Sequence, residues 1–511
     1  MDGYIPSNLV CWLRRVDPQL TIPQPQIDVS SGVPIYRQVY AHFKNLIVSG
    51  RLQAGDRLPA TRELAGKIGL NRTTITAAYE LLEAEGLIRR HVGRGSFVAD
   101  IARPARRRLD WQALLSQPEW DLPHLPPPAN VRISFATSRP SADLFPLQDV
   151  RELLDQILDS AAADVLQLGS PTGYPPLRRY LWQAARQAGE ARDSDEIIVT
   201  SGCQQALDLL QRVLIEPGDT VAVEDPVYPG VHQVLVRGGA RLAGVPVGRR
   251  GIDLDRLAAV LRSRRPKLLI VTPDFQNPTG VTMPLEERQT LLQLCRDSGT
   301  IVAENDIYAG LRYEGAPVPS LKQLDEAGDV IQLRSFSKVA FPGLRVGWVL
   351  APRAVIARLA EAKQWSDLHT DQLAQALLWR FAESGRLDQH RRRVIEGGRR
   401  RLAAALESCR RHLPAGAHFT RPEGGMNLWV ELPELLDADG LLPAAHAAGV
   451  DYLPGRYFAV NRPCHHALRL SFAGTSPAGI REGIAILGKL FREELDRARA
   501  FPPPEPAPAL V

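Results

Sequence analysis

An alternation of short β-branched runs with helical patterns, between residues 131 and 495, constrains the fold of this chain most. Strand candidates are Ile197–Thr200, Thr220–Val223, Lys267–Thr272, Thr300–Ala303 and Val330–Leu333. Parallel strands need crossover connections of this kind, which are usually helices. The pattern predicts an α/β domain with a mostly parallel sheet. Apolar runs beyond residue 400 predict a smaller α+β lobe at the C-terminal end.

A region with a different pattern precedes this domain. Apolar residues four apart predict a helix from Pro34 to Gly50, and a second short helix follows Pro59. Asn71 is a good N-cap for a third helix, which ends at Gly86. Two short strands then flank a glycine-rich tip at 92–95. Three helices and a two-stranded wing predict a winged helix-turn-helix, mostly α-helical, over 31–100.

Positive charge is concentrated in this N-terminal region. Residues 31–108 contain fourteen Lys and Arg against six Asp and Glu, whereas the whole chain has a net charge of only +5. Such an excess suits a polyanionic partner. The third helix would read a major groove from its first turn, and its residues Thr73, Thr76 and Tyr79 are expected on the face opposite Ile75 and Leu82.

The rest of the chain is expected to connect or flank these domains. We expect an N-terminal extension over 1–30, a proline-containing linker over 101–130 and a disordered tail over 496–511. The five cysteines are far apart with no CxxC pair, which favours a reducing cytoplasm and neither disulfides nor a zinc site. No membrane span or signal peptide is expected.

The N-terminal motifs resemble the GntR family of bacterial repressors. The resemblance rests on Arg57-Leu-Pro-Ala-Thr-Arg-Glu-Leu-Ala, on Asn71-Arg-Thr-Thr-Ile-Thr and on Gly93-Arg-Gly-Ser-Phe-Val. It implies that the DNA-facing positions are Arg62, Arg72, Thr73, Thr74, Thr76 and Gly93, and Arg94 at the wing tip is added from its position. Ala60 departs from the family, which usually has a serine cap there. A winged helix that binds protein instead of DNA is the alternative.

Chemistry-bearing residues of the α/β domain fall at the ends of the predicted strands. Lys338, in Ser335-Phe-Ser-Lys, precedes Arg345 by seven residues, so an amine, a guanidinium and two hydroxyls share one turn. A lysine amine can condense with the aldehyde of pyridoxal phosphate, and arginine and serine can hold its phosphate. Ser201-Gly202-Cys203 lies between a strand and a helix predicted to begin near Ala206, where backbone amides can bind phosphate.

Further residues complete such a site. Asp306 can hold a proton on the pyridine nitrogen, Tyr308 and Asn277 can bond the phenolic oxygen, and Tyr228 can stack on the ring. Together these motifs resemble the fold-type I aminotransferases. The resemblance implies that Lys338 is the Schiff-base lysine, that Ser335, Ser337 and Arg345 bind phosphate, and that Arg469 grips a substrate carboxylate. A strand-edge ion pair is the alternative role for Arg469.

A GntR-like domain joined to an aminotransferase-like domain resembles the MocR/GabR family of regulators. Two departures stand out. Leu168 replaces a tyrosine that touches the phosphate across the dimer, and Thr137-Ser138 replaces a Gly-Gly pair near the substrate. The α/β domain is also similar to the aminoadipate and kynurenine aminotransferases, so transaminase activity is possible.

The resulting hypothesis is a cytoplasmic, homodimeric regulator that binds promoter DNA and pyridoxal 5'-phosphate. It would sense an amino acid or amine through an external aldimine. The alternative is an active aminotransferase that carries a DNA-binding domain. A cofactor-binding scaffold without turnover or a DNA site is a third reading.

Overall fold

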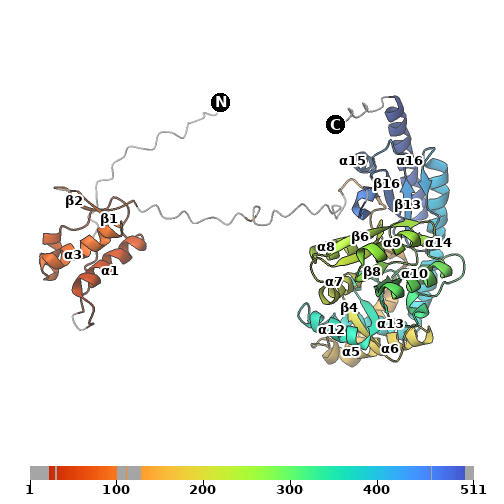
Figure 1. Ribbon diagram of the computed structural model, residues 1–511, viewed down its shortest axis with the longest axis horizontal. Coiled ribbons are helices and arrows are strands. Elements are labelled where there is room, and N and C mark those ends of the chain that lie inside the picture. Colours follow the sequence, from red (N-terminus) through yellow and green to blue (C-terminus); the bar gives the residue numbers. More distant parts are fainter. Residues whose placement is uncertain are drawn as a thin grey trace. The chain divides into compact units, whose positions relative to one another are not determined.

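The computed structural model describes residues 22–28, 31–91, 93–100, 111, 128–461 and 463–500. The chain separates into two compact units, Met1–Trp120 and Asp121–Val511, which are described one at a time (Figure 1). Most of the expected extension and linker, and the tail beyond residue 500, lie outside the described residues. No helix in the part of the chain that is described is long and apolar enough to cross a membrane.

The N-terminal unit is a winged helix. Its helices and its antiparallel wing strands are α1 (Ile35–Val48), α2 (Thr61–Ile68), α3 (Arg72–Ala84), β1 (Ile88–His91) and β2 (Gly95–Val98). The three helices pack through apolar side chains with no exposed surface, among them Val39, Phe43 and Ile75. The Asn71 side chain accepts a hydrogen bond from the Thr73 amide at 3.1 Å, as expected for an N-cap. Ala60 caps α2 with no side-chain bond.

One sequence expectation for this unit is wrong. Tyr79 was expected on the exposed face of α3, but it is completely buried and its hydroxyl donates to the Pro59 carbonyl at 2.9 Å. Residues four apart lie on the same face of a helix, so Tyr79 follows Ile75 into the core. Its ring packs edge-on against Phe43, with 5.6 Å between ring centroids. The exposed face of α3 is therefore narrower and more polar than expected.

The second unit contains an eight-stranded mixed sheet with helices on both faces (Figure 1). In spatial order its strands are β4 (Asp195–Thr200), β11 (Gly347–Pro352), β10 (Val330–Ser335), β9 (Ile301–Asn305), β8 (Leu268–Val271), β5 (Thr220–Asp225), β6 (Arg241–Gly248) and β7 (Gly251–Ile252). β11 and β7 are antiparallel to their neighbours. The other strands run in one direction, so their carboxyl ends meet at one edge.

Both faces of this sheet are covered by apolar contacts. One face packs on α7 (Cys203–Leu214), α8 (Pro229–Arg237) and α12 (Arg353–Gln364). The other packs on α5 (Leu147–Val165), α6 (Pro175–Gln187), α13 (Gln372–Glu383), α9 (Leu254–Arg264), α10 (Leu285–Ser298) and α11 (Leu321–Leu324). Burial on both faces explains why the central strands are continuous apolar runs.

A smaller lobe follows the sheet domain. Its four-stranded antiparallel sheet has the order β12 (His418–Phe419), β13 (Asn427–Glu431), β16 (Ala467–Ser471) and β15 (Leu453–Pro454). Long helices α14 (Arg386–His412) and α16 (Pro477–Ala500) and the short α15 (Leu442–Ala447) surround it. β14 (Val450–Asp451) pairs in parallel with β3 (Ile133–Ser134), which ties the start of this unit to the lobe. α16 continues to Ala500, past the expected boundary at 495.

Candidate functional site

The connection between β10 and β11 brings the expected lysine, serines and arginine together. The Ser335 hydroxyl lies 2.9 Å from that of Ser337, and the Arg345 guanidinium donates to Ser337 Oγ at 3.4 Å. Arg345 has a left-handed backbone, with φ 53°, after the short helix η3 (Pro342–Leu344). This turn directs a cation and two hydroxyls to one place, which suits a phosphate dianion.

The N-terminus of α7 meets Arg345. α7 begins at Cys203, three residues earlier than expected, and Gly202 is its N-cap with φ 78°. A Cβ atom on Gly202 would lie 2.6 Å from Arg345 Nη2, so only glycine allows this approach. The first amides of a helix are free donors, and here they lie beside a guanidinium. Burial raises the pKa of the Cys203 thiol to about 12, so this cysteine is no nucleophile.

Lys338 lies between this turn and the segment that precedes α5. Its amine donates to the Ser138 carbonyl at 2.6 Å and lies 5.6 Å from the centroid of the Tyr308 ring. The Thr137-Ser138 departure noted in the sequence is therefore in direct contact with the lysine. Ser138 Oγ is buried and has no hydrogen-bond partner among the described residues, so it is available to a bound molecule.

Tyr308, Asn277 and Arg469 form a buried polar chain. Asn277 Nδ2 donates to the Tyr308 hydroxyl at 3.4 Å, and Arg469 Nη1 donates to Asn277 Oδ1 at 3.0 Å. Burial favours the neutral phenol of Tyr308, but the charges of Lys338 and Arg469 outweigh it and lower the pKa of Tyr308. Burial also lowers the pKa of Arg469 to about 10. Arg469 is buried and forms no ion pair with a carboxylate among the described residues, which suits an anionic ligand.

Asp306 follows β9 and is almost completely buried. Its Oδ2 accepts hydrogen bonds from Arg334 at 2.5 and 2.7 Å, while its Oδ1 is buried with no partner in the described residues. An unpaired carboxylate oxygen fits a protonated pyridine nitrogen. Burial raises the pKa of Asp306 to about 6, against the opposing effect of Arg334. The residues present thus fit pyridoxal phosphate.

Two expected residues have more peripheral places. The Ser201 amide donates to Gln205, and its hydroxyl donates to Asp367 at 3.3 Å, so both are already engaged within the chain. Tyr228 is the N-cap of α8 and is 39% exposed. Burial raises the pKa of Tyr228, while the charges of Arg469 and Arg345 act in the opposite direction, so its phenol lies within reach of these two charges.

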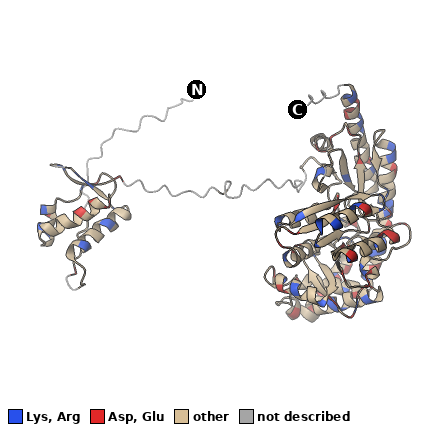
Figure 2. Cartoon of the chain, viewed as in Figure 1, with Lys and Arg blue, Asp and Glu red and all other residues tan. Residues whose placement is uncertain are grey.

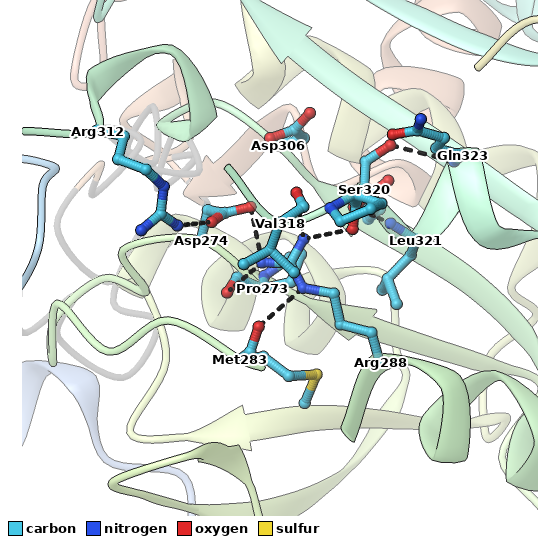
Figure 3. A network of polar contacts seen from close by, with 12 residues as sticks. Pro273, Asp274, Met283, Arg288, Asp306, Arg312, Val318, Ser320, Leu321 and Gln323 are labelled. Atoms are coloured by element: carbon cyan, nitrogen blue, oxygen red, sulfur yellow. Dashed lines mark hydrogen bonds and ion pairs between the residues drawn. The ribbon is translucent and has the colours of Figure 1, made fainter. Parts of the chain in front are cut away.

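Sequence reasoning missed the residues that support this constellation. Arg334 forms ion pairs with both Asp306 and Glu190. Asp367 accepts hydrogen bonds from Ser201 and Gln205 and so fixes the turn before α7. Asp274 is held by two arginines, Arg288 and Arg312, at 2.9 and 3.0 Å, beside Asp306 (Figure 3). Arg334 precedes the Ser335 motif directly, which was the one available signal.

The expected DNA-binding residues share the exposed surface of the N-terminal unit. Arg62, Arg72 and Arg94 are exposed and make no ion pair with the described residues, whereas Lys44, Lys67 and Arg90 are paired with glutamates. Figure 2 shows basic residues along the helices of this unit. Thr73 is exposed, Thr74 and Thr76 are half-buried, and the Thr76 hydroxyl donates to the Arg72 carbonyl at 2.9 Å. Gly93, with φ 78°, forms the exposed wing turn.

Fold and site together define a pyridoxal-phosphate-dependent protein of fold type I that also carries a winged helix. Two family descriptions match the chain: Aminotransferase class I and II over residues 131–487, and Bacterial regulatory proteins, gntR family, over residues 35–98. The chain belongs to the aminotransferase class I and II family and, with its GntR domain, to the MocR type of regulator within it. The family depends on pyridoxal phosphate, and the expected fold, cofactor and domain combination are confirmed.

Relatives of both kinds are similar to this chain. The probable rhizopine catabolism regulatory protein MocR of Rhizobium meliloti is 31% identical over 93% of this chain and 99% of its own length. Aromatic-amino-acid aminotransferase 1 of Thermococcus litoralis is 38% identical over 71% of this chain and 89% of its own. LysN, an α-aminoadipate aminotransferase of Thermus thermophilus solved with a phosphopyridoxyl-leucine, is 38% identical over 72% of this chain and 94% of its own, with a TM-score of 0.68.

Proposed function

We propose that this protein is a cytoplasmic transcription regulator that binds promoter DNA through α3 and the wing, and responds to an amino acid or amine bound at the Lys338 site. The observation that carries this proposal is the full-length similarity to a regulator, which includes both domains in the same order. An enzyme alone has no use for a basic winged helix whose exposed arginines, among them Arg62 and Arg72, form no ion pair within the described residues.

The residues of the site would divide the binding between them. Pyridoxal phosphate, when bound, supplies an aldehyde for which the amine of Lys338 and the amine of an effector compete. Arg345, Ser335, Ser337 and the amides of α7 would hold the phosphate. Arg469 would hold the effector carboxylate, and its contact with Asn277 at 3.0 Å would report that binding to Tyr308. An effector can shift DNA binding only through different affinities for two states.

A homodimer is part of this proposal. Two neighbouring segments expose large apolar side chains: Leu166 and Leu168 are each 72% exposed, and Trp365 is 89% exposed. The segment with the two leucines and the loop with Trp365 are neighbours, since a Cβ on Gly169 would lie 2.2 Å from Gln372, the residue at which that loop ends. The loop with Trp365 also contains Asp367, which accepts a hydrogen bond from Ser201 at the site. An exposed apolar patch beside a cofactor site fits burial against a second copy of the chain.

The test is an effector titration of DNA affinity. Fluorescence anisotropy with upstream DNA would be measured against a panel of amino acids and amines, for the wild type, Lys338→Ala and Arg469→Ala. We expect one ligand to change DNA affinity five- to 150-fold, a coupling of about 1–3 kcal/mol, and both variants to lose the response. Indifference of DNA binding to every ligand that perturbs the cofactor spectrum would overturn the proposal.

Transamination is the second candidate, because the residues that it needs, the buried Arg469 and the Lys338 amine beside Ser138, are both present. In that function Lys338 would also move the substrate Cα proton. Steady-state assays with the same panel decide between the two. Many turnovers per second, with DNA binding unaffected by the substrate, would favour the enzyme.

A further inference from the structure

A buried cluster of charges lies directly behind Asp306. Glu304 and Asp306 come from β9 and the residue after it, and Gln332 and Arg334 lie on the adjacent strand β10. Gln332 is paired with Glu304 in the parallel register, and side chains two apart point to the same face. Glu190, from the loop between α6 and β4, completes the cluster from the side.

Arg334 connects the members of this cluster. Its Nη2 donates to Asp306 Oδ2 at 2.5 Å and to Glu190 Oε1 at 2.7 Å, and its Nε donates to Asp306 Oδ2 at 2.7 Å. All the hydrogen bonds that Asp306 accepts in the described residues, including one from Gln332 at 3.3 Å, go to Oδ2. Oδ1 therefore stays free, and the orientation of the carboxylate is fixed.

The cluster holds one more carboxylate than it holds guanidinium groups. Burial, together with the charge of Asp306, raises the pKa of Glu304, which favours the neutral form of this carboxyl. Burial also raises the pKa of Asp306, but the Arg334 guanidinium, bonded to its Oδ2, opposes this effect and favours the ionised form. Two carboxylates, Asp306 and Glu190, then share one guanidinium, which leaves one negative charge. A protonated pyridine nitrogen at Oδ1 would bring the total to zero.

Other charged groups near Asp306 contribute less to this balance. Asp274 lies beside it, but two arginines neutralise Asp274 (Figure 3). Cys203 faces Asp306 from α7, and its raised pKa keeps the thiol neutral. Glu190 is thus the group that compensates Arg334.

We propose that Arg334 and Glu190 are a positioning pair for the cofactor ring: Arg334 turns Asp306 so that Oδ1 faces the ring nitrogen, and Glu190 offsets the positive charge that would otherwise weaken the hold of Asp306 on the nitrogen proton. The inference rests on the role proposed above for Asp306. It adds two residues, 144 positions apart in the chain, that tune how strongly the ring withdraws electrons.

The pair predicts opposite effects for two neutralising substitutions. Glu190→Gln leaves Arg334 opposed only by Asp306. The proton affinity of the ring nitrogen should therefore fall at least tenfold, which lowers its pKa by about one unit. Arg334→Gln removes the competing cation, while the glutamine amide can still donate to Asp306 Oδ2 and keep its orientation, so the proton affinity of the ring nitrogen should rise. The double variant removes both charges and leaves neither of them buried without its partner. The proton affinity of the ring nitrogen should then return to within about threefold of the wild-type value.

The measurement is the pH titration of the ring nitrogen by ¹⁵N NMR, in full-length protein loaded with ¹⁵N-labelled pyridoxal phosphate. Glu224→Gln is a matched control. Glu224 is a buried carboxyl of the same sheet, and burial raises its pKa and so favours the neutral form that glutamine resembles. Asp306→Asn is the reference for complete loss of the carboxylate.

The outcomes separate this inference from the proposed site. A lowered titration in Glu190→Gln that the double variant restores supports the positioning pair. If Glu190→Gln and the double variant both titrate like the wild type while Asp306→Asn does not, the pair is structural only and the inference is wrong. If Asp306→Asn also titrates like the wild type, the role of Asp306 itself is wrong. Glu190→Gln and the double variant decide the matter even if Arg334→Gln does not fold.

Discussion

Arg469 Nη1 lies 3.0 Å from Asn277 Oδ1, so the arginine expected to hold a ligand carboxylate is joined to the residue expected to hold the cofactor oxygen. The same guanidinium donates to the Ala136 carbonyl, and its Nε is buried without a partner in the described part of the chain. A ligand carboxylate at Arg469 would thus act on Asn277 and, through it, on Tyr308. This chain of contacts would join a ligand carboxylate at Arg469 to the residues expected to hold the cofactor.

Arg469→Lys should weaken binding of a carboxylate ligand while leaving cofactor binding intact. Lysine keeps the charge but cannot form the planar, two-pronged contact, and loss of one charged hydrogen bond costs about 1.5–3 kcal/mol. We expect an approximately 10- to 100-fold higher Kd for an amino acid and no change for the corresponding amine without a carboxylate. Ligand-induced change in cofactor absorbance measures both. Equal weakening of both ligands would contradict a carboxylate role.

Lys338→Ala should abolish covalent attachment of the cofactor and its near-visible absorbance after desalting. Among the described residues, Lys338 is the only lysine whose amine contacts the site, through Ser138 and Tyr308. Borohydride treatment followed by peptide mass spectrometry checks the assignment in the wild type. Lys363→Ala, which loses a buried lysine paired with Asp367 nearby, is the control. A modified residue other than Lys338 would contradict the assignment.

Gly202→Ala should weaken pyridoxal phosphate binding at least tenfold. The new Cβ would lie 2.6 Å from Arg345 Nη2, and φ 78° is strained for alanine by roughly 1–2 kcal/mol. Gly343→Ala is the matched control in the neighbouring turn, because a Cβ there meets nothing within 4 Å. Equilibrium dialysis of the cofactor gives both Kd values. Wild-type affinity for Gly202→Ala would place the phosphate elsewhere.

Stability should fall as the pH drops below 6.5 because of His390. This histidine is fully buried between Phe341 and Phe381, and burial lowers its pKa from the usual 6.5 to about 4. The unfolded chain takes up the proton near pH 6.5 and the folded chain only near pH 4, so stability is full above this window and is lost through it, by up to about 3 kcal/mol.

Urea unfolding at pH 7 and pH 5 tests this contribution. His390→Leu should lose packing with the two phenylalanines at both pH values but lose less stability than the wild type between them. His465→Leu, at an exposed position, should keep the wild-type difference. An unchanged pH difference in His390→Leu would mean that other groups cause the acid sensitivity.

The sequence indicated the strands, the wing and the cofactor motifs because each depends on local pattern: apolar runs, caps and short spacings. Tyr79 was misplaced because it was grouped with Thr73 and Thr76 at a spacing of three residues, although it also lies four residues after the buried Ile75. The start of α7 was set too late because Gly202 and Cys203 carry no N-cap side chain.

The Arg334–Glu190 pair was beyond any local pattern. The two residues are 144 positions apart, and only the folded sheet brings their charges to 2.7 Å. Whether a charged residue is paired or free depends on such long-range packing. The same reason hides the role of Asp367, which reaches Ser201 from a loop 166 residues away.

Arg72→Ala should weaken DNA binding without changing the cofactor spectrum. Arg72 is exposed at the first turn of α3, beside the N-cap Asn71, and has no ion pair in the described residues, so its guanidinium is available to DNA. A base contact is worth about 1–3 kcal/mol, whereas a phosphate contact contributes about one unit to the slope of log affinity against log salt concentration.

Lys44→Ala is the control: Lys44 pairs with Glu85 at the opposite end of α3, so its loss should change DNA affinity little. Anisotropy with operator and random DNA at several salt concentrations distinguishes the two contacts: loss for operator alone indicates base readout, and equal loss with a flatter slope indicates phosphate. Unchanged affinity for both DNAs at every salt concentration would mean that α3 does not read the DNA.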